Sequence, residues 1–298
     1  MTTIAILTPD PADSSYRGQW PQVLARLEAA LARSDIVAVP ERWTDHVEDA
    51  GGLTRFPLVL PVLLWGYHRD HARFMRAVAT WTAAGVPLAN PAAVLGWNSD
   101  KSYLARLEAK GVPIPPTIWT EAVTGADVEA AFEAFGAEDL VIKPTVSGGA
   151  WQTLRLTRGQ PLIDPPAGAA MIQPYLPAIE TEGETSLLFF GGTFSHAVNK
   201  TPVPGDFRIQ VQFGGTYVPV EPPAEAMALA EQVLVAIDVP LLYARIDMTR
   251  DPAGNWVLME AELIEPDFYL KNDPRQGAGF AEAVRARLQA PAQAPAEA

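Results

Sequence analysis

The chain has 298 residues, of which 48% are hydrophobic and 19% are charged, and this balance indicates a globular protein of two or three domains or subdomains. Its formal net charge of −13 argues against a nucleic-acid partner, because binding to phosphates needs clustered lysine and arginine. The absence of cysteine excludes disulfides and thiolate catalysis and fits a cytoplasmic protein. No apolar run reaches the ~18 residues of a membrane span, and the N-terminus lacks the basic segment of a secretory signal.

Residues 1–95 alternate between strand and helix patterns. The predicted strands are Ile4–Leu7, Ile36–Val39, Leu58–Leu64 and Val86–Leu88, and the predicted helices are Trp20–Ala32 and His71–Ala84. Such alternation predicts a parallel, Rossmann-like sheet of about four strands. No G-x-G-x-x-G motif follows the first strand, so the dinucleotide fingerprint is absent.

The middle of the chain continues with shorter elements. Asn98-Ser99-Asp100 is expected to cap a helix over 101–110, and Thr124 and Asp127 resemble a capping box for a helix over 126–135. Further strands are predicted at 117–120, 140–144, 171–176, 185–190 and 193–200, and further helices at 224–237 and 280–288. The Ala/Pro-rich tail from Ala290 to Ala298 is expected to be disordered.

A hairpin near the C-terminus places several carboxylates together. Its strands are Tyr243–Thr249 and Trp256–Glu262, and a four-residue loop from Pro252 to Asn255 sets Asp247 opposite Glu260 and Arg245 opposite Glu262. Tyr243 and Leu258 are predicted to share that face. Three carboxylates on one face repel each other unless a cation neutralises them, and oxygen ligands of this kind suit Mg²⁺. The alternative is a solvated edge hairpin, and a one-residue slip in register separates the carboxylates.

Two further patterns suit anion binding but are ambiguous alone. Lys143 ends a strand and precedes the loop Ser147-Gly148-Gly149, whose backbone can approach phosphates, although such a loop is also an ordinary turn. Arg208 can bind a carboxylate or phosphate in bidentate fashion, or can form a surface salt bridge.

His68 and His71 follow a predicted strand. They suggest either a metal pair or a contact with substrate at the end of the sheet.

The order of these patterns is more specific than any one of them. A helix-start lysine and a strand-end lysine with its loop are followed by Gln173-Pro-Tyr175-Leu176, Gly-Asp-Phe-Arg208, Arg-x-Asp and Glu-x-Glu. This order resembles the ATP-grasp superfamily over about residues 91–269. It is most similar to the glutathione synthetase and ribosomal-protein glutamate-ligase branch and to small relatives such as the D-cycloserine synthetases.

The resemblance implies an α/β fold of the α+β ATP-grasp type. A Rossmann-like substrate domain over 1–95 is expected to precede two α+β subdomains that clasp ATP. Their expected bounds are 96–172 for the lid and 173–289 for the part with the metal site, with the tail at 290–298.

The resemblance also implies a role for each matching residue. Lys101 and Lys143 are expected to hold the ATP phosphates from opposite sides beneath the loop Ser147-Gly148-Gly149. The adenine and ribose are expected to contact Gln173, Tyr175, Leu176 and Glu184. Arg208 is expected to bind the γ-phosphate and the acyl-phosphate, with Lys200 and Arg245 near the same anions. Two Mg²⁺ ions are expected on Asp247, Glu260 and Glu262.

Two positions depart from the family pattern. Glu262 stands where relatives usually have asparagine, and its added charge predicts either tighter Mg²⁺ binding or a balancing cation such as Arg245 or Lys271. Gln210 stands where relatives often have asparagine.

The resemblance implies a ligase that activates a small amino-acid-like or peptide carboxylate with ATP, through an acyl-phosphate, and joins it to an amine or similar nucleophile. An internal nucleophile, and hence ring closure of an amino-acid derivative, is the first alternative. A non-catalytic ATP-binding module or a small-molecule kinase is an alternative of another class. Small-molecule substrates, no nucleic-acid or membrane partner, and a homo-oligomer are expected. One geometric requirement follows: the three carboxylates must share a face, with Lys101 and Lys143 across a cleft from them.

Overall fold

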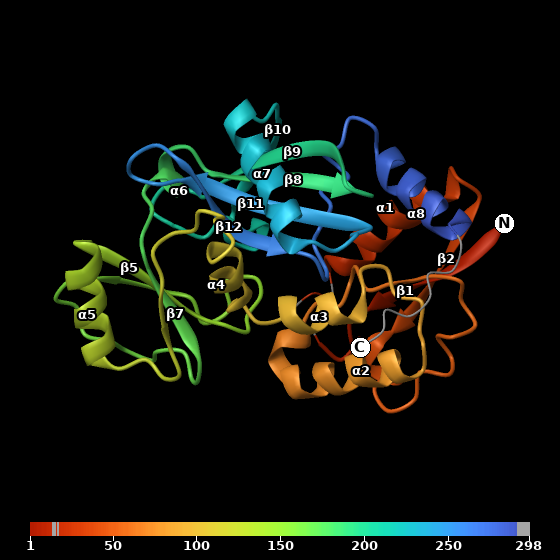
Figure 1. The fold of residues 1–298 in the computed structure, drawn as a ribbon, viewed down its shortest axis with the longest axis horizontal. Coiled ribbons are helices and arrows are strands. Elements are labelled where there is room, and N and C mark those ends of the chain that lie inside the picture. The colour runs from red at the N-terminus through yellow and green to blue at the C-terminus, as the bar shows by residue number, and fades with distance from the viewer. Residues whose placement is uncertain (14–15, 17, 291–298) are drawn as a thin grey trace.

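Three β-sheets run along the molecule in the computed structural model, which describes residues 1–13, 16 and 18–290 (Figure 1). In this described part, no helix has the length and apolar character needed to cross a membrane. The tail expected to be disordered lies outside the described residues from position 291 onward.

The N-terminal sheet is parallel, as predicted, with the order β2-β1-β3. Its strands are β1 (Thr2–Thr8), β2 (Ile36–Arg42) and β3 (Val59–Leu60), accompanied by α1 (Trp20–Ala32), η2 (Trp43–His46), η3 (Tyr67–Asp70) and α2 (His71–Ala83). The predicted fourth strand over Val86–Leu88 is only a single parallel bridge between Val59 and Leu88. Pro87 has no N–H to continue a ladder, although its carbonyl accepts a 2.9 Å hydrogen bond from the amide of Val59.

The second sheet has the order β4-β7-β5-β6, and all its pairings are antiparallel. Its elements are β4 (Ile118–Thr120), α5 (Gly125–Phe135), β5 (Asp139–Pro144), β6 (Leu154–Thr157) and β7 (Ala170–Pro174). The reciprocal capping box between Thr124 and Asp127 is present, as predicted. Helix α5 packs Val128 and Phe132 onto the sheet in a small core of its own. This sheet carries Lys143 at the end of β5.

Two short helices join the first two sheets, and here the predicted helix over 101–110 was too long. The structure has α3 (Ala92–Asn98) and α4 (Tyr103–Glu108). Asn98 does not cap α4: its Nδ2 donates to the Ala261 carbonyl at 2.8 Å, and its Oδ1 accepts from the Leu263 amide at 3.0 Å. The edge strand of the third sheet offers Asn98 two buried partners, and these outweigh a local cap.

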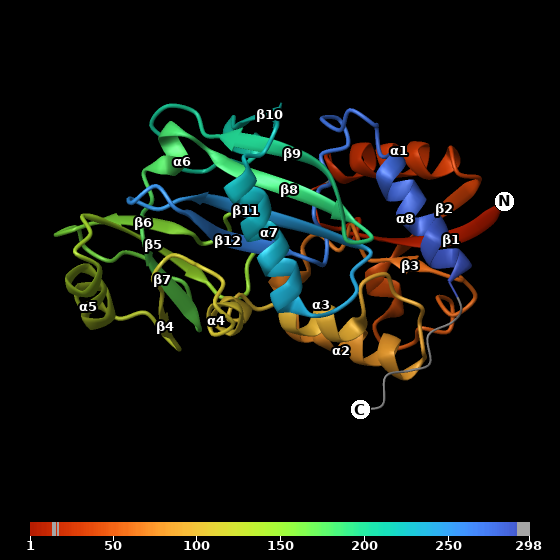
Figure 2. The same cartoon turned by 45° about the horizontal axis from the view of Figure 1, so that its top comes forward.

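The third sheet is antiparallel with the order β10-β9-β8-β11-β12. Its elements are α6 (Ala178–Thr181), β8 (Glu184–Phe190), β9 (Thr193–Thr201), η4 (Val211–Phe213), β10 (Thr216–Val220), α7 (Ala224–Ile237), β11 (Tyr243–Arg250) and β12 (Trp256–Glu262). Helix α7 lies across one face of the sheet, as Figure 2 shows, and packs Leu229 and Val233 against Ile246 and Met248 in one apolar core. The opposite face is left for the site.

The last helix, α8 (Ala278–Gln289), returns to the N-terminal part of the molecule and lies beside α1 (Figure 1). Its Phe280 and Val284 join a core with Ile4 and Leu27. The first and third sheets are therefore packed together, and the domain bounds drawn from the sequence stay a prediction.

Candidate active site between two sheets

A β-bulge sets the register of the β11–β12 hairpin. Asp247 lies opposite Glu260 and Arg245 opposite Glu262, as predicted, but Met248 pairs with Leu258, so Met259 is an extra residue. The turn is one residue longer than expected, and the bulge restores the register beyond it. The prediction that Leu258 shares the carboxylate face was wrong, because the shift turns its side chain into the α7 core. Met259 lines the cleft instead.

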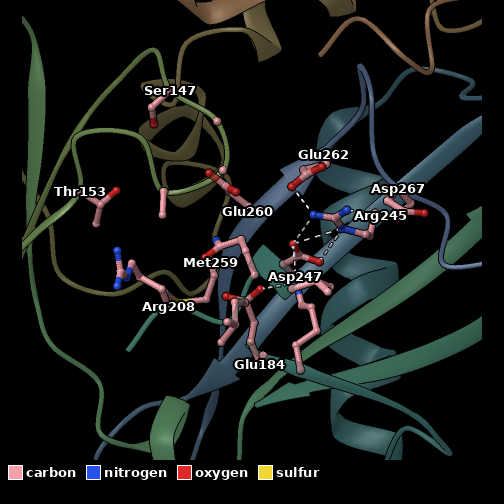
Figure 3. Close-up of a pocket in the computed structure, with 18 of the residues that line it drawn as sticks. Ser147, Thr153, Glu184, Arg208, Arg245, Asp247, Met259, Glu260, Glu262 and Asp267 are labelled. Atoms are coloured by element: carbon pink, nitrogen blue, oxygen red, sulfur yellow. Dashed lines mark hydrogen bonds and ion pairs between the residues drawn. The ribbon is translucent and has the colours of Figure 1, made fainter. Parts of the chain in front are cut away.

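The three carboxylates of this hairpin come together, as required. Oxygens of Asp247, Glu260 and Glu262 all lie within 4.8 Å of one another. Figure 3 shows them along one face of the hairpin, with Glu184 below. We call Asp247, Glu260, Glu262 and Glu184 the carboxylate face. Such a set of oxygen donors could hold a hard divalent cation.

Arg245 neutralises two members of the carboxylate face (Figure 3). Its Nε and Nη2 donate to Asp247 at 3.0 and 2.9 Å, and Nη2 also donates to Glu262. Burial alone raises the pKa of the Asp247 carboxyl, but the charges of Arg245 and Lys200 hold that pKa well below its usual range. Burial dominates for Glu262 and raises its pKa to about 7 despite the guanidinium beside it.

Lys200 neutralises Glu184 and adds a second positive charge beside Asp247. Its Nζ lies 2.6 Å from Glu184 and 3.2 Å from Asp247, and its side chain is almost fully buried. Although burial opposes its charge, the two carboxylates raise the pKa of the Lys200 ammonium well above its usual value. The Ser186 hydroxyl completes the set with a 2.6 Å hydrogen bond to Asp247.

Lys101 bridges the carboxylate face and the glycine loop. Its Nζ lies 2.8 Å from Glu260 and donates to the Ser147 carbonyl at 2.8 Å and to the Ser147 hydroxyl at 3.1 Å. Lys101 is placed by the segment that Asn98 fastens to β12. The connecting segment that carries Lys101 and strand β12 thus meet at the ion pair between Lys101 and Glu260.

Lys143 lines the cleft without a partner of its own, since its Nζ forms no ion pair or hydrogen bond with the residues that the structure describes. Burial lowers the pKa of its ammonium, and the nearby Glu260 raises it in part. Lys143 shares a cleft of about 740 Å³ with Lys101 and the carboxylate face. That volume is within the range of sites for small molecules and cofactors.

The segment after β7 lines one end of the same cleft. Gln173 donates to Thr117 Oγ1 at 2.9 Å, and the Tyr175 hydroxyl donates to Glu180 at 2.6 Å beneath the guanidinium of Arg155. The amide of Leu176 has no hydrogen-bond partner among the described residues. A flat ligand in this end of the cleft could therefore bind that amide.

Arg208 lines the cleft but is held within its own segment. It donates to Asp206 with Nε at 3.0 Å and Nη2 at 2.7 Å, and its Cζ lies 3.8 Å from the centre of the Phe213 ring. Figure 3 places it across the pocket from Arg245. The structure thus brings Lys101 and Arg245 to the carboxylate face, so Lys101 contacts the carboxylates and does not lie across the cleft from them as expected. Lys143 and Arg208 line other parts of the cleft.

The two histidines differ in environment. His71 Nε2 lies 2.8 Å from the Ser99 hydroxyl, whereas His68 lines the cleft. In the described part of the chain, the one group of three or more metal-ligand side chains is that of Asp247, Glu260 and Glu262.

Sequence reasoning missed some residues that shape the site. Asn90 binds the Tyr243 and Leu263 carbonyls at 2.9 and 2.7 Å and so fastens β11 to the segment after β12. Glu265 lines the cleft, and burial raises the pKa of its carboxyl well above the usual value. Neither a single buried asparagine nor a single glutamate beyond the end of a strand gives a periodic signal in the sequence.

The comparisons with known proteins agree with this geometry. No family model matches the chain. The chain is 29% identical over 275 residues to the cycloserine biosynthesis protein DcsG of Streptomyces lavendulae, a match that covers 83% of this chain and 87% of that protein. It is 30% identical over 216 residues to the glutathione synthetase of Prochlorococcus marinus (strain MIT 9313), covering 69% of this chain and 65% of that protein.

Solved structures give the same result. The crystal structure of D-cycloserine synthetase DcsG matches with a TM-score of 0.79 and 26% identity, over 96% of this chain and 100% of that one. A D-alanine–D-alanine ligase from Bacillus anthracis matches with a TM-score of 0.68 over 96% of this chain and 99% of that one, and its 16% identity speaks for the fold alone. The chain belongs to the ADP-forming ATP-grasp ligases.

Proposed function

We propose that the cleft binds ATP and Mg²⁺ and activates the carboxylate of a small amino-acid-like substrate for attack by a nucleophile. One observation carries the proposal: three carboxylates with oxygens within 4.8 Å of one another share a cleft with Lys101 and the unpaired Lys143. Two opposite charge sets in one cleft suit a metal–polyphosphate complex, which presents both signs.

The carboxylate face fits Mg²⁺ by the chemistry of its donors, which are all carboxylate oxygens. In this role Asp247, Glu260 and Glu262 would hold two ions, and the carboxylates would exchange part of their present contacts with Arg245, Lys101 and Lys200 for the metal. Mg²⁺, when bound, neutralises the phosphate charge and orients the transferring group. Arg245, released in part from Glu262, then faces the anionic substrate region together with Lys200.

In this proposal Lys143 binds a phosphate of ATP without breaking an existing contact, because its ammonium has no partner among the described residues to give up. Lys101 binds from the other side, and the loop Ser147-Gly148-Gly149 covers the phosphates. Arg208 joins them after exchanging Asp206 for the γ-phosphate. Each contact is to charge that develops on the transferring group, so removal of one lowers the rate by roughly 10²–10³.

The end of the cleft after β7 receives the base and ribose. The free amide of Leu176 supports this placement, since it can donate to the edge of adenine, while Gln173 and Tyr175 form the walls. Glu184, at the start of β8, binds the ribose.

The reaction follows from this arrangement. A carboxylate oxygen of the substrate attacks the γ-phosphorus, the bond from that phosphorus to the β,γ-bridging oxygen breaks, and ADP leaves. The nucleophile then attacks the acyl carbon, loses a proton and expels inorganic phosphate. The residues of the cleft contribute position and charge rather than covalent chemistry, and the closed loop excludes water from the acyl-phosphate.

An internal nucleophile is the second candidate function. It is favoured by the similarity to the cycloserine biosynthesis protein DcsG, which covers most of both chains. In that case one small molecule supplies both the carboxylate and the attacking group, and the product is a ring.

The test is a phosphate-release screen with ATP, Mg²⁺ and a panel of amino acids and small carboxylates. Hydroxylamine added to an active mixture should trap the acyl-phosphate as a hydroxamate, and product masses separate joining of two molecules from ring closure. A stable phosphorylated product without acyl transfer indicates a kinase, and ATP binding without turnover indicates a binding module. If calorimetry detects no binding of ATP or Mg²⁺, and Asp247→Asn and Lys143→Ala change nothing, the proposal is wrong.

A further inference from the structure

His68 is a buried histidine of the cleft to which the proposed chemistry gives no role. It lies in η3, directly after the left-handed residue Gly66, and only 6% of it is exposed. Its Nε2 is buried and has no hydrogen-bond partner among the residues that the structure describes. Burial, with the charges of Arg69 and Lys101, lowers the pKa of its imidazole to about 4, so the ring is neutral at ordinary pH.

The glycine loop rests on this ring. A Cβ atom at Gly148 would lie 3.0 Å from Nδ1 and 3.1 Å from Cε1 of His68, closer than side-chain carbons normally approach. The Trp151 ring, three residues further on, lies 5.6 Å from the imidazole at an angle of 50°. The ring of His68 therefore lies against Gly148 and Trp151 of the loop. We call this contact the loop seat.

The two adjacent glycines of the loop are glycine for different reasons. Gly149 has a φ of +60°, a backbone conformation that side chains disfavour, whereas Gly148 is outside that region. What excludes a side chain at Gly148 is the space taken by His68. Sequence alone cannot separate these cases, and the structure makes them a matched pair.

The loop is also held from its other side. Lys101 donates to the Ser147 carbonyl at 2.8 Å while it binds Glu260 of the carboxylate face. The loop thus lies between a lysine from the connecting segment and a histidine from η3 of the N-terminal part. A loop held by both must respond to the position of the segment after β3, whose residues Trp65 and Tyr67 line the same cleft.

We propose that His68 is a positioning residue: the loop seat holds Gly148 and Trp151 in the closed position over the phosphates and so couples the substrate end of the cleft to loop closure. The inference rests on the proposed function, because the loop has phosphates to cover only if ATP binds there. His68 acts through the loop and exchanges no proton with the substrate.

A double-mutant cycle tests the loop seat. Gly148→Ala should raise the KM for ATP about tenfold, since a shift of a few tenths of an ångström costs less than the roughly 10²-fold of a 1 Å displacement. His68→Ala should raise that KM by a similar factor and increase the phosphate released per product, because water reaches the acyl-phosphate. In the His68→Ala background, Gly148→Ala should cost nothing further, because the added methyl has room.

Gly149→Ala is the matched control, and it should cost the same factor in both backgrounds, since its strain comes from the backbone. The proposal is overturned if Gly148→Ala is harmless in the wild type, or if it costs an equal factor with and without His68. Thermal unfolding midpoints of all variants show whether a loss reflects general instability.

Hydrogen exchange provides a measurement that does not depend on turnover. In the metal-free and nucleotide-free protein, amides over 145–153 should exchange several-fold faster in His68→Ala than in the wild type, while peptides from α7 stay unchanged. Equal exchange over 145–153 refutes the loop seat even if the wild type proves inactive with every substrate. Failure of the wild type to bind or turn over ATP, with faster exchange in the variant, refutes the proposed function instead.

Discussion

The two walls of the cleft treat charge and polarity differently. On the carboxylate face, every carboxylate has a cation within hydrogen-bond distance: Asp247 and Glu262 have Arg245, Glu184 has Lys200, and Glu260 has Lys101. The facing wall, which we define as Lys143 and His68, differs. Neither Nζ of Lys143 nor Nε2 of His68 has a hydrogen-bond or ion-pair partner among the described residues. The charges of one wall are paired within the described part of the chain, and these side-chain nitrogens of the other wall are not.

This difference separates stability from function. Buried ion pairs destabilise a protein when one partner is removed, because the other charge is left buried and uncompensated. An unpaired buried group has no such partner, and its removal relieves a desolvation cost. Mutations on both walls should therefore lower activity, whereas a large loss of stability is expected only where a buried partner on the carboxylate face is removed.

The largest effect is expected for Asp247→Asn on the carboxylate face. Asp247 is 2% exposed and pairs with both Arg245 and Lys200, so the free energy of unfolding should be about 3–5 kcal/mol lower in the variant. Loss of a metal ligand should also lower kcat by roughly 10³. Urea unfolding and calorimetry with Mg²⁺ measure the two losses. The exposed Glu231→Gln on α7 is the control, and an unchanged Mg²⁺ affinity in Asp247→Asn contradicts the assignment of this face.

Next in size is the contrast between the two lysines. Lys101→Met and Lys143→Met should each lower kcat/KM for ATP by roughly 10²–10³. Lys101→Met should also destabilise the fold by about 3 kcal/mol because Glu260 loses its cation, whereas Lys143→Met should change stability by less than about 1 kcal/mol. Steady-state kinetics and thermal unfolding measure both. Equal loss of stability in the two variants breaks the comparison of the walls.

The neutral ring of His68 on the facing wall predicts a pH dependence of stability. The pKa of the His68 imidazole is about 4 in the folded protein and near 6.5 in the unfolded chain. Below pH 6.5 the unfolded chain therefore binds a proton at His68 that the folded chain does not bind. The contribution is present above pH 6.5 and is lost as pH falls toward 4. Between pH 7 and pH 5 the wild type should lose about 2 kcal/mol more of its unfolding free energy than His68→Gln. The groups that set this pKa besides burial are Arg69, Lys101 and Asp13, and parallel curves for the two proteins contradict the prediction.

The smallest effect is expected for Glu262→Gln, on the rim of the carboxylate face. The Glu262 side chain is 30% exposed, against 3% for Asp247, so its removal disturbs fewer buried partners. Arg245 keeps its bidentate contact with Asp247 in this variant. Mg²⁺ affinity should fall about tenfold with little change in stability, as measured by calorimetry and thermal unfolding. A loss as large as that of Asp247→Asn indicates that the two carboxylates contribute equally.

Much of the carboxylate face was predictable because its signals are local. Alternation along two neighbouring strands predicted which residues oppose each other, and the order of the motifs singled out Lys101 at a helix start and Lys143 at a strand end. Two errors offset each other there: the turn is one residue longer than expected, and the bulge at Met259 restores the register. Position along a strand cannot reveal a bulge, because the extra residue is accommodated by packing on both sides of the sheet.

The sequence by itself determined the kinds of element, the parallel and antiparallel classes of sheet and the order of the charged motifs, since these depend on periodicity and residue chemistry over short distances. Only the tertiary structure decided which charges meet. Arg245 pairs with Asp247 and Glu262, Asn98 binds β12 instead of capping a helix, and His68 takes the space beside Gly148. Those outcomes depend on contacts between segments far apart in the chain, where burial and the lack of competing water select one partner from several of similar chemistry.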